Sequence, residues 1–102
     1  MPHRYTPQDL RFIIEQATIY QCACPAQICT SLQSAHALYA YQQQCLTETD
    51  IDAAVHQRIA ETAERLIAEL EQCLQDVLVL EGWNLDTLEM PAALQKRLLD
   101  NL

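Results

Sequence analysis

A stretch of about thirty residues, 50–80, constrains the fold most, because apolar side chains recur through all of it every three or four residues. This spacing marks one face of an α-helix, whereas a half-buried strand alternates every second residue. At 1.5 Å per residue the helix would be about 45 Å long. Its apolar face, which we predict to turn inward, comprises Val55, Ile59, Thr62, Leu66, Leu70, Cys73, Val77 and Leu80, widened by Ala63, Ile67 and Leu74.

Two further helices are predicted ahead of this one, over residues 7–21 and 25–45. Thr6 is a good N-cap for the first of them, because a proline follows it and an aspartate stands three residues later. Pro25 separates the two helices, since proline lacks the backbone N–H and disfavours the helical conformation in the residue before it. We therefore expect an extended Cys24 and a second helix that begins at Pro25.

The whole chain, 1–102, is predicted to be a single all-α domain. It contains one glycine and four prolines, few of the residues that tight turns between β-strands require. Gly82 suits the end of the long helix, and a short last helix is predicted over 91–100. The short connection near Thr47 makes the second and third helices antiparallel neighbours. The expected fold is a small antiparallel helical bundle built on this long hairpin, with a shorter N-terminal helix.

The charge of the chain argues against several classes of partner. Six lysines and arginines stand against fourteen acidic residues, which gives a formal net charge of −8. Nucleic acids and anionic membrane surfaces are bound through clustered basic side chains, so neither is an expected partner. No apolar run approaches the roughly 20 residues of a membrane-spanning helix, and no apolar segment follows the first residues as in a secretory signal. We predict a cytoplasmic protein.

Cysteines form the most distinctive local pattern, a C-x-C-x4-C run at the bend between the first two helices. Cys22, Cys24 and Cys29 make up this run. In an antiparallel hairpin, positions whose numbers add up to about 95 lie level, which places Cys73 beside residue 22. Four thiols are therefore expected to converge at one end of the bundle. Cys45, at the other end, is interpreted as a small buried apolar residue.

Four thiols in one place would suit a metal or redox site. A helix N-terminus favours the thiolate, which is both the soft metal ligand and the nucleophile, and Cys22 and Cys24 stand beside one. An iron–sulfur cluster, zinc or copper, or the sensing of redox state, is the predicted function, with Cys22, Cys24, Cys29 and Cys73 as ligands. The spacing matches neither the usual zinc nor the ferredoxin pattern. The alternative is a cofactor-free helical interaction or adaptor module with structural cysteines.

The remaining polar residues indicate no further chemistry. Acidic side chains along the long helix (Glu61, Glu64, Glu69, Glu71 and Asp76) are interpreted as a solvated face, as are Gln42, Gln43 and Gln44, although the glutamines could instead form a polar layer between helices. No glycine-rich phosphate loop or nucleophile–base pattern is present, so catalysis is not expected. The apolar face of the long helix exceeds what two shorter helices can cover. Homodimerisation through that helix or the C-terminal tail is therefore predicted, with a protein partner as the alternative.

Overall fold

The computed structural model describes residues 4–19, 23–45 and 49–95, and within them it contains helices and no strand. The helices are α1 (Pro7–Ile19), α2 (Ala23–Gln44) and α3 (Asp50–Glu81), and residues 92–95 add one helical turn. The predicted all-α class is confirmed. None of the helices in the described part of the chain is both long and apolar enough to cross a membrane.

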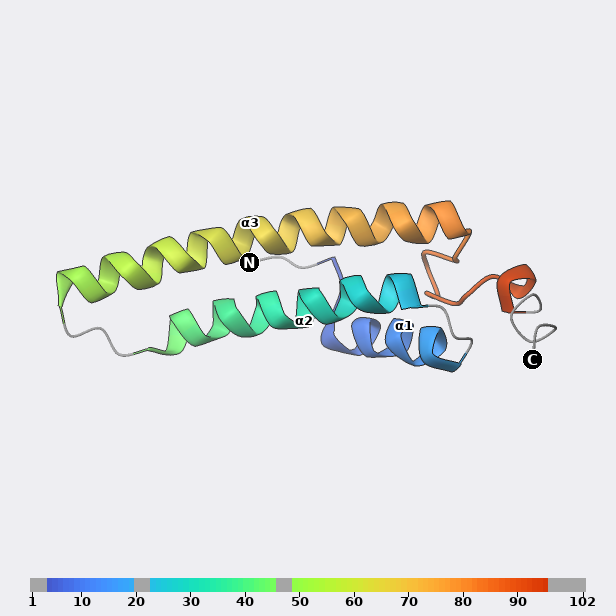
Figure 1. The fold of residues 1–102 in the computed structure, drawn as a ribbon, viewed down its shortest axis with the longest axis horizontal. Helices are drawn as coiled ribbons and strands as arrows, with labels where there is room; N and C mark the ends of the chain where they lie inside the picture. The colour runs from blue at the N-terminus through green and yellow to red at the C-terminus, as the bar shows by residue number, and fades with distance from the viewer. Residues whose placement is uncertain (1–3, 20–22, 46–48, 96–102) are drawn as a thin grey trace.

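α2 and α3 form the predicted long antiparallel hairpin, and α1 packs against α2 (Figure 1). α1 reaches along only part of α2, near the end of the hairpin where α3 finishes. At the opposite end the first turns of α3 extend beyond the last turn of α2. The described protein is accordingly a rod of 59 × 21 × 17 Å, three helices thick at one end and two at the other.

α1 begins with the predicted cap. The Asp9 backbone N–H donates to the Thr6 hydroxyl at 3.0 Å, and the Thr6 N–H donates to the Asp9 carboxylate at 2.9 Å. Each side chain thus satisfies a backbone donor that the first helical turn leaves free. Tyr5 and Leu10, on either side of the cap, are both buried and fix the direction in which the chain enters the helix.

α2 begins two residues earlier than predicted, at Ala23, so Cys24 is helical and not extended. Pro25 therefore lies within the first turn, where a missing N–H breaks no intrahelical hydrogen bond. Its ring is also fully buried, which adds apolar contact at this end of the bundle.

α3 has a defined cap at each end. The Thr49 hydroxyl accepts the Asp52 N–H at 3.0 Å, and Gly82 ends the helix in the left-handed conformation with φ of 81°. Only glycine adopts that conformation without steric cost. The Trp83 N–H then donates to the Leu78 carbonyl at 2.9 Å, which turns the chain back over the end of the bundle.

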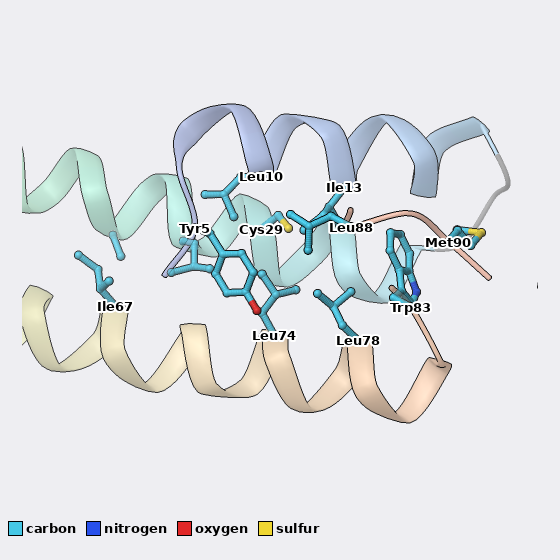
Figure 2. Packing of buried hydrophobic residues seen from close by; sticks show 12 residues of the cluster. Tyr5, Leu10, Ile13, Cys29, Ile67, Leu74, Leu78, Trp83, Leu88 and Met90 are labelled. Carbon is cyan, nitrogen blue, oxygen red and sulfur yellow. The ribbon is translucent and has the colours of Figure 1, made fainter. Parts of the chain in front are cut away.

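The main core lies where the three helices meet (Figure 2). α1, α2, α3 and the segment after α3 all contribute to it, through Leu10, Ile13, Cys29, Leu32, Ile67, Leu74, Leu78, Trp83, Leu88 and Met90. Gln16 fastens the last segment: its side-chain amide donates to the Leu88 carbonyl at 2.6 Å and accepts the Met90 N–H at 2.7 Å. The segment after α3 is thereby held against α1.

The two-helix end of the hairpin is held by smaller and more polar side chains. Ala60 and Ala63 of α3 are buried there, and the Gln42 side-chain oxygen of α2 accepts a 2.7 Å hydrogen bond from His56 Nδ1. Gln42 is itself buried, so it belongs to the polar interhelical layer and not to the predicted solvated face. Alanines allow close helix approach but bury little apolar surface, so this end has the weaker hydrophobic contribution.

Candidate functional site

The face that α3 turns inward is not the one predicted. Its buried residues are Ala60, Ala63, Ile67, Glu71, Leu74 and Leu78. On the predicted face, Val55 is 50 % exposed, Leu66 43 % and Leu80 85 %. Leu66 and Ile67 illustrate the difference, because successive residues point about 100° apart around a helix. The stripe expected to widen the core is therefore the core, and the larger apolar stripe lies beside it on the surface.

This rotation changes the predicted cysteine site. Cys73 belongs to the larger apolar stripe beside the core and is exposed, so the expectation that its sulfur points into the bundle is wrong. Cys24 is exposed as well. Cys29 instead is fully buried among apolar side chains, and this burial raises the pKa of its thiol to about 12. A thiol with that pKa is protonated at neutral pH, whereas a metal ligand or nucleophile must be the thiolate.

No three cysteine, histidine or acidic side chains among residues 4–19, 23–45 and 49–95 are arranged to hold a metal ion. Cys29 lies in the core and Cys73 on the surface. Cys22 lies outside the described residues, so the complete four-thiol site stays a prediction. Cys45 is half-buried, and its side chain has a hydrogen bond with Tyr41.

One acidic residue of α3 departs from the predicted solvated face. Glu71 is buried, and its carboxylate accepts the backbone N–H groups of Arg4 at 2.7 Å and Tyr5 at 3.3 Å. Sequence periodicity missed this role, because the donors come from a segment 66 residues earlier in the chain. The other four acids, Glu61, Glu64, Glu69 and Asp76, are exposed as predicted.

The outer stripe of α3 runs beside its buried face and contains exposed residues together with the half-buried Ile59, Leu70 and Val77. We define it as Ile51, Val55, Ile59, Thr62, Leu66, Leu70, Cys73, Val77 and Leu80. Ile51, at 76 % exposed, extends the face predicted from the sequence by one more turn. From Ile51 to Leu80 the outer stripe covers 29 residue steps, about 44 Å along the helix axis. Exposed apolar areas of this extent mark interaction surfaces more often than scattered apolar residues do.

A groove borders the outer stripe at its centre, between α2 and α3. It has a volume of about 430 Å³ and is lined by Thr30, Ser31, Ser34, Ala35, Leu38, Leu66 and Leu70. The α2 side consists of small residues up to Leu38, which leaves room for side chains from outside. The two leucines of α3 form the apolar wall. A helix laid along the outer stripe could place side chains into this groove.

Comparisons of the chain with protein-family models, with curated proteins and with solved structures find no match.

Proposed function

We propose that this protein is a helical interaction module, which acts by binding a helix of a protein partner along the outer stripe of α3. The observation that supports it best is an apolar stripe along the longest helix of a small chain, in which Ile51, Val55, Leu66 and Leu80 are exposed. Burying that face would remove several large aliphatic side chains from water, and for those already about half-buried, such as Val55 and Leu66, the gain is about half of the 1.5–3 kcal/mol that full burial from water gives.

The elongated shape supports the same proposal. A compact chain of this length has a radius of gyration of about 13 Å, whereas the described residues have one of 16.8 Å. A rod exposes more surface than a globule of the same chain length. Such a shape is typical of proteins that complete their packing with another chain.

The geometry also limits what the partner can be. A long, straight and narrow apolar face matches the apolar face of another amphipathic helix, with anchors at intervals of three and four residues. The homodimer predicted from the sequence would use this same surface. Exposed side chains of both charges, including Arg58, Arg65, Glu69 and Asp76, flank it, so a matching partner should carry both charges as well.

Cys73 provides a direct test of the proposal, because its thiol lies on the outer stripe while Cys24, also exposed, lies on α2. We expect the alkylation rate of Cys73 to fall at least fivefold in native extract, or at high protein concentration, relative to dilute purified protein. Cys24 should react at the same rate in all three samples. Mass spectrometry with fragmentation, which locates the label on the individual cysteines, gives both rates in one experiment.

Two matched variants complete this test. Leu66→Asp introduces a charge in the middle of the outer stripe and should abolish the protection of Cys73. Ala68→Asp introduces the same charge at an exposed α3 position off the outer stripe and should leave the protection intact. If Cys73 reacts equally fast in dilute protein, concentrated protein and extract, the outer stripe is not an interaction surface and the proposal fails.

A further inference from the structure

The outer stripe is nearly symmetric about its central residue, Leu66. Its members lie 4, 7, 11 and 15 residues before Leu66 and 4, 7, 11 and 14 residues after it. An antiparallel pair of identical helices related by a two-fold axis needs this kind of symmetry, since residue i of one helix meets residue j of the other and the reverse. A parallel pair places no such requirement on the sequence.

From this symmetry, and resting on the proposed function, we infer that the partner is a second copy of the chain. The two α3 helices pack antiparallel along their outer stripes, with the two-fold axis passing beside Leu66. Residues whose numbers add up to 132 then form the layers of the interface. Leu66 meets Leu66 of the partner subunit, and Ile59 meets Cys73 of the partner subunit. The same rule pairs Val55 with Val77 of the partner subunit.

The layers obtained in this way agree with coiled-coil packing. Before Leu66, the step from Val55 to Ile59 is four residues and the step from Ile59 to Thr62 is three. After Leu66, the step from Leu70 to Cys73 is three residues. These steps give alternating a and d positions, and in an antiparallel pair each a position faces a d position. The steps on the two sides of Leu66 are both four residues. Because the two-fold axis passes beside Leu66, these two steps lie next to the axis and occur identically in both chains.

The charges beside the outer stripe are complementary in the same register. α3 has only two basic residues, Arg58 and Arg65, and both are exposed on the flank that points away from α2. Asp76 and Glu69 are exposed on this same flank. The antiparallel register brings Arg58 to Asp76 of the partner subunit, and Arg65 to Glu69 of the partner subunit. Both pairs add up to 134, and each occurs twice in the dimer.

These arginines are available for such pairs. In the monomer the Arg58 and Arg65 guanidinium groups donate to the hydroxyl of Thr62, on their own helix. A parallel dimer would instead turn this flank toward the opposite flank of the partner helix, on its α2 side, so neither arginine would meet Asp76 or Glu69 of the partner subunit. Charge complementarity therefore favours a second copy over an unrelated helix, and the antiparallel over the parallel arrangement.

Charge exchange tests the register directly. Arg58→Glu should weaken dimerisation about three- to thirtyfold at low ionic strength, because it places like charges together at two sites. The double variant Arg58→Glu/Asp76→Arg should restore the dissociation constant to within about twofold of the unchanged protein. Sedimentation velocity over a concentration series gives the dissociation constants, and circular dichroism checks that helix content is unchanged.

A control separates the register from a general effect of charge. Arg58→Glu/Glu61→Arg has the same net charge as the double variant, but residue 61 lies away from the interface flank. It should not restore dimerisation. If it restores as well as Asp76→Arg does, or if Arg58→Glu has no effect, the register is overturned. A protein that stays monomeric at all concentrations overturns the second copy as partner, while protection of Cys73 in extract would still support the proposed function.

Discussion

The Cys29 side chain lies wholly inside the three-helix core, and its thiol is shielded from water. Burial raises the pKa of this thiol from its ordinary value of 9 to about 12. Between these two values the unfolded chain releases the proton while the native chain keeps it. Ionisation then favours the unfolded state, so the stability that the neutral thiol provides below pH 9 is lost as the pH rises.

We therefore predict that the free energy of unfolding decreases more steeply above pH 9 in the unchanged protein than in Cys29→Ala. The difference in the free energy of unfolding between the unchanged protein and Cys29→Ala should narrow by about 1 kcal/mol from pH 8 to pH 10. Urea unfolding at both pH values measures it. Parallel pH dependences would show that Cys29 ionises in the native protein as readily as in the unfolded chain.

At the scale of single helices, the sequence predicted the elements well and their orientation poorly. Local signals identified the Thr6 cap and the left-handed Gly82, because each depends on residues within one helical turn. The buried side of α3 depends instead on what α2 presents to it. The outer stripe carries the larger side chains, yet α2 packs on the neighbouring stripe, where Ala60 and Ala63 allow close approach.

That error carried over to the candidate site. Cys73 and Leu74 are neighbours in the sequence, and a rotation of about 100° decides which of them faces the core. The prediction turned Cys73 inward, whereas the structure puts Leu74 in the core and Cys73 on the surface. The same rotation explains the exposed outer stripe, so one difference between prediction and structure moves the functional argument from the cysteines to α3.

The segment after α3 depends on Gln16, which joins it to α1 by two buried hydrogen bonds. Gln16→Leu keeps the side-chain bulk but leaves the Leu88 carbonyl and the Met90 N–H without this partner. We expect a loss of about 1–3 kcal/mol in the free energy of unfolding, measured with urea. Gln8→Leu, at an exposed position of the same helix, should change it by less than about 0.5 kcal/mol. Equal effects of the two changes would contradict the role assigned to Gln16.

For the whole molecule, the all-α class and the long hairpin followed from composition and periodicity, but the shape did not. Nothing in the periodicity of α1 shows that it covers only one end of the hairpin, or that the first turns of α3 extend past α2 (Figure 1). These features leave a rod of 59 × 21 × 17 Å with the outer stripe along it. A second copy that covers that stripe would complete the packing of the rod.

Disulfide mapping of Ile59→Cys tests this most directly. Residues 59 and 73 are about 21 Å apart along one helix, whereas a disulfide requires Cα atoms within about 7 Å. A bond between them can therefore form only between chains. After mild oxidation we predict a covalent dimer, and its digest should contain a pair of peptides joined by a disulfide between residue 59 and Cys73. In the Ala68→Cys control, no disulfide between residue 68 and Cys73 should form. Recovery of 59–59 and 73–73 pairs in its place, or of no 59–73 pair, would contradict the antiparallel dimer.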